Sequence, residues 1–125
     1  MNYGNHLGND HLLSIIHETR VQWLNALGCT ELDVGGCGLI MADVMIAYKN
    51  EGFYGDDLLC AVFADEIQTS SFDVLYRLST QRKGERLLIA EAKTGMVCFD
   101  YQARKIMPVP EKLLNKLRSI SPGSN

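Results

Sequence analysis

Two residues capable of proton transfer stand side by side in an apolar stretch near the N-terminus, His17 and Glu18. An imidazole or a carboxylate acts as a general base when it lies within hydrogen-bond reach of the proton that it removes. Neighbouring side chains on a helix diverge by about 100°, so only one of the two can point at a given site. Burying both is costly, which favours a functional role. The structural alternatives are a histidine satisfied in a core or an interface, and a Glu18–Arg20 ion pair.

A second group of candidates lies where a helix is predicted to begin, at Gly8, Asn9 and Asp10. The first N–H groups of a helix have no partner within it, and together with the helix dipole they can stabilise a developing oxyanion. Gly8 would let a ligand approach the backbone closely. The alternative is that these residues form only a turn and a helix cap, with Asp10 as the partner of the dipole. His6, in the preceding loop, either orients a substrate or holds the loop.

The element that carries these residues is a helix between Asn9 and Gly28, which supply an N-cap and a C′ glycine. About eighteen residues at 1.5 Å each give roughly 27 Å of helix. Its apolar residues spread over more than half of the circumference: Leu12, Leu13, Ile15, Ile16, Val21, Trp23, Leu24 and Leu27. A belt this wide predicts a helix that is surrounded by other structure.

Strand-like segments follow at residues 39–49, 58–68, 72–79 and 86–99, separated by turn residues. The third alternates most clearly, with one apolar face formed by Phe72, Val74, Tyr76 and Leu78. Residues 81–84 predict a polar hairpin loop. Gly95, inside the last strand, predicts a bulge or a close backbone approach. Two prolines end the sheet, and residues 111–118 predict a short helix.

The order is therefore one long buried helix, four long strands joined by short turns, and a short helix. Short turns predict a meander of neighbouring antiparallel strands, which must curl at this length. A long central helix wrapped by a curled antiparallel sheet is the hotdog fold, of the α+β class. We expect a single domain over residues 1–118 and a flexible tail over 119–125. An open sheet leaves an unpaired edge that usually pairs with a second copy, so a homodimer is expected.

Composition and charge exclude several classes of protein. The chain has 125 residues, which suits one domain, and its 15 acidic against 12 basic residues give a net charge of −3. That balance gives no electrostatic reason to expect nucleic-acid binding. No apolar run approaches the roughly 18 residues of a membrane span, and the N-terminus lacks the pattern of a signal peptide.

The four cysteines lie far apart, at Cys29, Cys37, Cys60 and Cys98. They form no Cys-x-x-Cys pair, and no histidine stands at metal-ligand spacing from them, so no metal site is expected. Without an export signal, the sequence predicts reduced thiols in a cytoplasmic protein.

Several motifs, taken in order, resemble those of one family. Residues 5–10 (Asn-His-Leu-Gly-Asn-Asp) and 17–20 (His-Glu-Thr-Arg) resemble the loop and helix of hotdog-fold acyl-CoA thioesterases of the 4-hydroxybenzoyl-CoA thioesterase type. The family loop is commonly Gly-His-Val-Asn-Asn, and the family helix carries Glu-x-Arg. Residues 54–56 resemble the Gly-Asp that opens the middle strand, residues 92–100 the last strand, and residues 108–110 its ending. The resemblance thus runs through nearly the whole chain.

This resemblance implies hydrolysis of an acyl-CoA to the free acid and CoA, with the carbonyl polarised by the helix N-terminus. It implies no cofactor beyond the coenzyme A of the substrate, and a homodimer or dimer of dimers with sites at the interface. Two departures stand out. Members normally begin with a strand before the histidine loop, for which this chain has no room. Many also carry a catalytic aspartate where this chain has Asn2, and an amide cannot act as a base or a nucleophile.

The resemblance also implies where coenzyme A would bind. Its phosphates call for cations, and the best placed by analogy stand at strand ends: Lys49, Arg104 and Lys105. Backbone groups of Thr94 and Gly95 are candidates to bind the pantetheine amides. The acyl pocket would be lined by aromatic residues, Tyr48, Phe53 and Tyr54. The alternatives are ordinary surface charges and core aromatics.

Two other functions remain open on the same fold. The first is a non-catalytic module that binds acyl-CoA, which Asn2 and the absent first strand favour. The second is a hydratase or dehydratase, which would need a histidine with an acidic partner over the α and β carbons of the acyl group. Fold alone does not choose among these, because function resides in the site.

Overall fold

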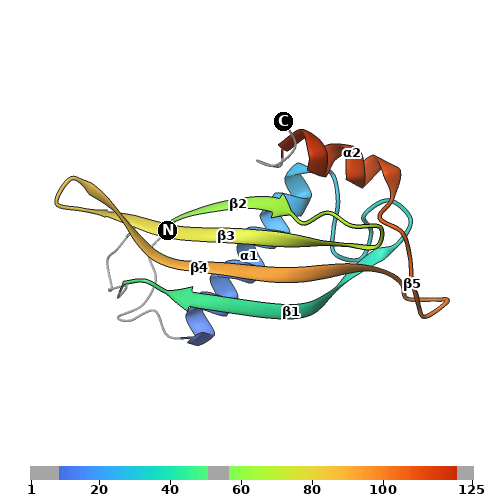
Figure 1. Ribbon diagram of the computed structural model, residues 1–125, viewed down its shortest axis with the longest axis horizontal. Helices are drawn as coiled ribbons and strands as arrows, with labels where there is room; N and C mark the ends of the chain where they lie inside the picture. The colour runs from blue at the N-terminus through green and yellow to red at the C-terminus, as the bar shows by residue number, and fades with distance from the viewer. Residues whose placement is uncertain (1–8, 51–56, 121–125) are drawn as a thin grey trace.

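The computed structural model describes residues 9–50 and 57–120, and it confirms one long helix, four long strands and a short terminal helix in that order (Figure 1). The helices are α1 (Asn9–Ala26) and α2 (Glu111–Ile120). The strands are β1 (Gly38–Tyr48), β2 (Leu59–Asp65), β3 (Ser71–Arg82), β4 (Glu85–Asp100) and β5 (Lys105–Ile106). The sequence does not predict β5, because two residues are too few for an alternating pattern.

Helix α1 ends in the hydrogen-bonding pattern that its C-terminal glycine predicts. Gly28 has a φ of +76°, the left-handed conformation expected of a C′ glycine. The N–H of Cys29 donates to the carbonyl of Leu24 at 2.8 Å, and the N–H of Gly28 donates to that of Asn25 at 2.9 Å. This is a Schellman motif, which satisfies carbonyls that the last helical turn would otherwise leave unpaired.

The strands do not form the simple meander that their turns predict. β2, β3 and β4 are sequential antiparallel neighbours, but β1 pairs with β4, so the order is β1–β4–β3–β2. The prediction is wrong at the connection between β1 and β2. Ten residues separate these strands, enough to span the roughly 14 Å between the two edges of the sheet, so turn-type residues there do not require neighbouring strands. β1 and β2 are the edge strands of the described sheet.

The hairpin between β3 and β4 is tighter than the loop predicted at 81–84. The strands pair as far as Arg82 and Glu85, which leaves Lys83 and Gly84 as the turn. Both turn residues have positive φ, +52° and +79°, as a type I′ turn requires. Because such a turn follows the twist of its strands, the polar residues around it continue the pairing.

The core lies between α1 and one face of the sheet. The predicted apolar face of β3 is confirmed, because Phe72, Val74, Tyr76 and Leu78 are all at most 1% exposed. Their cross-strand partners on β4 are also buried: Met96, Thr94, Ala92 and Ala90. From α1 the buried apolar residues are Leu12, Ile15, Ile16, Trp23 and Leu24. The helix is thus buried along one broad face rather than all round, and Leu13 is 43% exposed.

Helix α2 closes the end of this core through Leu113 and Leu117, both fully buried. It continues to Ile120, so residues 119 and 120, expected in the tail, are helical. The rest of the expected tail lies outside the described residues. The expectation of a missing first strand concerns the chain before Asn9, which lies outside the described residues.

Candidate active site

The N-terminal end of α1 projects beyond β1, the edge strand that it crosses (Figure 1). At the opposite edge of the sheet the helix contacts β2. The free N–H groups of its first turn therefore lie at the β1 edge rather than in the core. The helix begins at Asn9, with Asp10 in its first turn. His6, Gly8, Phe53 and Tyr54 lie outside the described residues. Their roles, and those of Asn9 and Asp10, stay predictions.

The predicted pair His17 and Glu18 is exposed on α1, so the cost of burial does not apply to it within one chain. Glu18 Oε1 accepts a hydrogen bond from Gln22 Nε2 at 3.1 Å. His17 Nδ1 lies 3.3 Å from Nη2 of Arg20. The two side chains thus have separate partners, as their divergence on a helix predicts.

Arg20 is the one charged side chain of α1 that enters the described core, and it is 6% exposed. Its Nε donates to Glu31 Oε1 at 2.5 Å, and its Nη1 donates to the hydroxyl of Tyr76 at 3.1 Å. The Tyr76 hydroxyl in turn lies 2.8 Å from Oγ1 of Thr94. Burial, the largest single influence, lowers the pKa of Arg20. The hydrogen bonds that Arg20 donates to Glu31 and Tyr76, with the electrostatic attraction of these partners, outweigh burial, and the pKa is raised. The predicted Glu18–Arg20 ion pair is replaced by Arg20–Glu31.

The α1-facing side of β1 is left largely uncovered by the helix. Val44 pairs with buried Thr94, and Tyr48 with buried Ala90, so these side chains share the face on which α1 lies. Even so, Met41, Val44 and Tyr48 are 48%, 43% and 47% exposed. On the other face of the strand, Met45 is 60% exposed. The β1 edge therefore presents apolar side chains beside the projecting end of α1.

The cations expected to bind CoA phosphates lie at opposite ends of the sheet. Lys49 follows the last residue of β1, and its N–H donates to Ile89 at 2.8 Å. Arg104 and Lys105 lie at the far end, where Lys105 pairs with Asp100 beyond the first residues of β1. The eleven residues of β1 span about 33 Å, so these cations do not meet within one chain.

Thr94 and Gly95, the residues expected to contact pantetheine, are occupied by contacts within the chain. The Thr94 side chain is fully buried against Tyr76. The N–H of Gly95 donates to Asp43 Oδ1 at 3.1 Å, next to a bulge in β1 between Met41 and Asp43. A Cβ on Gly95 would lie 2.9 Å from both Asp43 carboxylate oxygens. The predicted close approach at Gly95 is confirmed, but the approaching group is a side chain of the same sheet.

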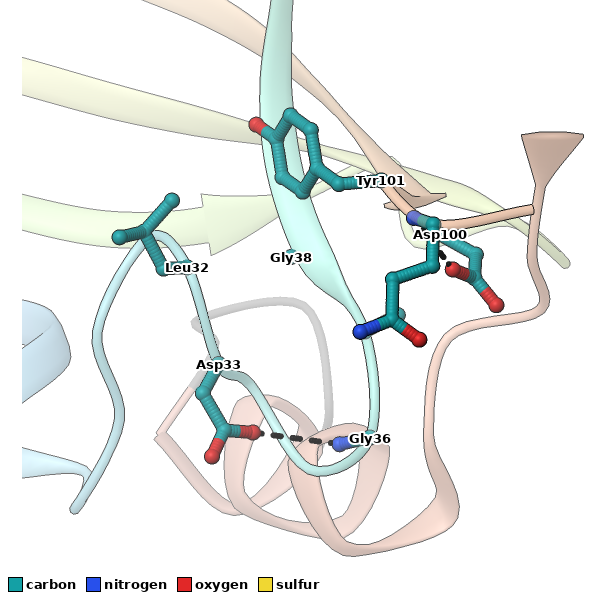
Figure 2. A pocket seen from close by; sticks show the side chains of 8 residues that line it. Leu32, Asp33, Gly36, Gly38, Asp100 and Tyr101 are labelled. Carbon is teal, nitrogen blue, oxygen red and sulfur yellow. Dashed lines mark hydrogen bonds between the residues drawn. The ribbon is translucent and has the colours of Figure 1, made fainter. Parts of the chain in front are cut away.

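A cavity of about 540 Å³ lies where β1 begins and β4 ends (Figure 2). Three of its polar side chains, Asp33, Asp100 and Tyr101, form hydrogen bonds within the chain. Asp33 Oδ1 accepts from the N–H groups of Gly35 and Gly36 at 3.0 and 3.2 Å, and these bonds lower the pKa of Asp33. Asp100 Oδ1 accepts from two backbone N–H groups at 2.9 Å, and the hydroxyl of Tyr101 donates to Leu39 at 2.7 Å. This cavity contains none of the predicted site residues.

A second cavity of about 280 Å³ lies on the face of the sheet away from α1. The apolar residues that line it include Met45, Phe63 and Leu75, and an Arg77–Glu91 ion pair of 3.2 Å borders it. It too lacks the predicted catalytic residues. Neither of these two cavities therefore brings the predicted catalytic residues together within one chain.

The described residues contain no group of three histidine, cysteine or acidic side chains placed to hold a metal ion. Among the described helices, none has the length and apolar character needed to cross a membrane.

Comparison with known proteins places this geometry in a family. The model of the thioesterase-like superfamily matches residues 1–117. The chain belongs to the thioesterase-like superfamily. It is 33% identical over 112 residues to a 1,4-dihydroxy-2-naphthoyl-CoA hydrolase from Synechococcus elongatus, covering 86% of this chain and 79% of that protein.

Solved structures support the same fold for this thioesterase. A 1,4-dihydroxy-2-naphthoyl-CoA thioesterase from Synechocystis superposes with a TM-score of 0.76 at 21% identity, covering 94% of this chain and 93% of that one. A mutant 4-hydroxybenzoyl-CoA thioesterase in complex with 4-hydroxybenzoyl-CoA superposes with a TM-score of 0.79 at 13% identity, covering 90% and 86%. The predictions of a hotdog fold, of this family and of a thioester hydrolase that acts on an acyl-CoA are confirmed.

Sequence reasoning missed two arrangements near the site. Glu31, the partner of Arg20, lies in an irregular segment, and Tyr76 is 56 residues from Arg20 in sequence. The Asp43–Gly95 contact depends on β1 pairing with β4, which the predicted meander excluded. A charged residue in an apolar helix, Arg20, and a charged residue in an apolar strand, Asp43, were the available signals.

Proposed function

We propose that this thioesterase hydrolyses an aromatic acyl-CoA and that it works as a homodimer with its active sites at the subunit interface. The observation that carries the acyl specificity is the 33% identity to a 1,4-dihydroxy-2-naphthoyl-CoA hydrolase over most of the chain. The acyl group in the name of that relative's substrate, 1,4-dihydroxy-2-naphthoyl, is a planar hydroxylated ring system. The exposed apolar side chains of β1 suit such a ring, and Tyr48 adds an aromatic face.

The character of β1 supports the proposed homodimer. β1 is an eleven-residue edge strand that contains one charged residue, Asp43, and no proline. Natural proteins protect exposed strand edges with charges, prolines or short strands, or they pair them. β2, the other edge, has only seven residues. Pairing β1 with its two-fold copy would continue the sheet and bury Val44, Met45 and their neighbours.

Such a dimer also brings the separated cations together. In an antiparallel pair with the two-fold axis near the middle of β1, Tyr48 of one copy lies beside Gly38 of the other. Lys49 then approaches the Arg104 and Lys105 end of the partner. A CoA molecule with its phosphates at this end would contact both subunits, which accounts for cations that one chain keeps about 33 Å apart.

The chemistry needs an oxyanion site, an activated water and an exit for the thiol. The first N–H groups of α1 would stabilise the oxyanion that forms when water adds to the thioester carbonyl. The C–S bond then breaks, and coenzyme A leaves as the thiol after taking up a proton. Glu18, His17 and Asp10 are the candidates to activate the water. We propose that no metal or organic cofactor takes part, so prolonged EDTA treatment should leave turnover unchanged.

A non-catalytic acyl-CoA-binding module is the second candidate. The observation that favours this candidate is Asn2, since the resemblance places this amide where many members have a carboxylate. The hydratase or dehydratase alternative has no comparable support.

The test is release of free CoA thiol from a panel of short, medium, long and aromatic acyl-CoAs. We expect aromatic acyl-CoAs to turn over fastest. Glu18→Gln keeps the bond to Gln22 but removes the carboxylate, and we expect it to lower turnover at least about 100-fold. The matched control is Glu91→Gln, on the opposite face of the sheet, which should leave turnover close to that of the unmodified protein.

Three outcomes would contradict parts of this proposal. Preference for alkyl substrates would reject the aromatic specificity. Binding of acyl-CoA without turnover would favour the binding module. A monomer in light scattering at assay concentration would reject the interface site, whereas a dimer or a dimer of dimers agrees with it. We also propose a cytoplasmic location, since all four cysteines are free, which cell fractionation would test.

A further inference from the structure

Arg20 is held so firmly that its guanidinium has a fixed direction. It is 6% exposed and bonds at once to Glu31, in the segment after α1, and to Tyr76 on β3. The Tyr76 hydroxyl is itself anchored by Thr94 on β4. A planar guanidinium bound through Nε and Nη1 cannot rotate without breaking both bonds. Its remaining Nη2 points along α1 toward His17, with the Nη2 atom 3.3 Å from Nδ1.

This contact defines the protonation of the histidine ring. A guanidinium carries only donors, so in its bond to His17 the Nδ1 atom must be the acceptor. A neutral imidazole has one protonated nitrogen, and with Nδ1 accepting, the proton is on Nε2. We infer that Arg20 holds His17 in the Nε2–H form, so that His17 serves the active site as a hydrogen-bond donor and not as its general base.

The consequence for the mechanism concerns which lone pair is available. A base must offer an unprotonated nitrogen, and the only one on this ring already accepts from Arg20. His17 can then donate through Nε2 to an oxygen of the substrate, of a bound water or of the partner subunit. The water-activating role passes to a carboxylate, of which Glu18 is the nearest on α1. This assignment rests on the proposed function, whereas the state of the ring does not.

The first experiment reads the ring directly, without substrate. Protein labelled with ¹⁵N at histidine is examined by NMR at a pH where the rings are neutral, with the His17 signals assigned by their loss in His17→Gln. We expect a proton on Nε2 and none on Nδ1. A proton on Nδ1, or a rapid mixture of the two forms, overturns the inference in the unmodified protein, whatever the variants do.

Two variants separate positioning from general structural support. Arg20→Met removes the donor, and His17 should then show a mixture of both forms. Tyr76→Phe removes one anchor of Arg20 but keeps the Nη2 donor, so the Nε2–H form should persist. If Arg20→Met does not fold, Arg20→Gln provides a weaker test with one amide in place of the guanidinium. Unchanged Nε2–H form in a folded Arg20→Met protein would overturn the role of Arg20.

The last arm tests the donor role during turnover. A glutamine at position 17 presents its amide N–H near the place of Nε2, whereas an asparagine presents it near Nδ1. We expect His17→Gln to retain about tenfold more turnover than His17→Asn or His17→Ala, the effect of one hydrogen bond. Equal loss in all three contradicts the donor role. If the unmodified protein hydrolyses no acyl-CoA, the proposed function fails, while the NMR result still decides the state of the ring.

Discussion

The interior beneath α1 and the β1 edge belong to one sheet but differ in how completely one chain satisfies them. Under the helix, Phe72, Val74 and Leu78 are at most 1% exposed, and each buried side-chain nitrogen or oxygen of the described residues has a partner. At the edge, Val44 is 43% and Met45 60% exposed on a strand with no outer neighbour in the described sheet.

This difference separates the surface that one chain buries by folding from the surface that the proposed dimer would bury. The interior stabilises the fold within one chain, and even its buried charge, Arg20, is bonded there to Glu31 and Tyr76. The edge carries apolar surface that a monomer leaves in water, together with the projecting end of α1. Substitutions in the two regions should therefore differ in what they disrupt, stability in one and assembly in the other.

The largest effect on stability is expected in the interior, from Phe72→Ala. Removing a fully buried ring leaves a cavity and costs about 3–5 kcal/mol in the free energy of unfolding. Leu75→Ala is the matched control, because Leu75 lies on the same strand with its side chain on the opposite, partly exposed face. Chemical denaturation should show a loss of under about 1.5 kcal/mol for the control. Equal losses would mean that both faces are buried, for example in a higher assembly.

At the edge, Val44→Lys should weaken the proposed dimer about 100-fold while changing the stability of each chain by less than about 0.5 kcal/mol. A lysine there would place a charge within the apolar surface that β1 is expected to bury. The matched control is Ala61→Lys, an exposed position on the other edge strand, β2. Light scattering across a concentration series should show dissociation for Val44→Lys alone, with turnover falling as dimer is lost. Dissociation by Ala61→Lys instead would move the interface to β2.

Gly95→Ala tests the boundary between the two regions, where β4 meets β1. Its Cβ would lie 2.9 Å from the Asp43 carboxylate oxygens, and overpacking of this kind costs about 1–3 kcal/mol. The double variant Gly95→Ala/Asp43→Ala removes the obstructing carboxylate, so thermal unfolding should recover part of the loss. No recovery would place the strain in the backbone rather than in this contact.

The sequence predicts the interior far better than the edge, for a physical reason. Local signals determine the interior: the 3.6-residue period of α1, the alternation of β3 and the glycine that ends the helix at Gly28. The edge depends on pairing between distant segments. Because the β1–β4 pairing was missed, the separation of Lys49 from Lys105 could not be predicted, although both were correctly placed near strand ends.

The candidate site shows the same contrast between features set by local sequence and features set by contacts between distant segments. The position of His17 on α1 could be predicted from the helix, but its partner could not, since Arg20 is oriented by Glu31 and by Tyr76, 56 residues away. If the site forms between two chains, as proposed, the partner adds contacts that no single-chain pattern contains. The residues were therefore identifiable by type, and their roles were not.

The smallest predicted effect is a decline of folding stability with rising pH, which arises in the interior alone. Burial, followed by the neighbouring Cys37, raises the pKa of Cys98 from 9.0 to about 12. Above pH 9 the unfolded chain releases this proton while the folded protein keeps it, so stability falls as pH rises between about 9 and 12, by about 1 kcal/mol at pH 10. The buried Tyr76 and Cys37, whose pKa values are also raised by burial, act in the same direction.

Denaturation at pH 8, 9 and 10 should show this decline, and Cys98→Ala should have a shallower one whatever its absolute stability. The exposed β1 edge contributes no buried thiol, so Val44→Lys should keep the slope of the unmodified protein. If Val44→Lys made the decline of stability with pH as shallow as Cys98→Ala does, the edge and the interior would unfold together, as one unit with the dimer. In that case the division between folding and assembly drawn from their exposures would not hold.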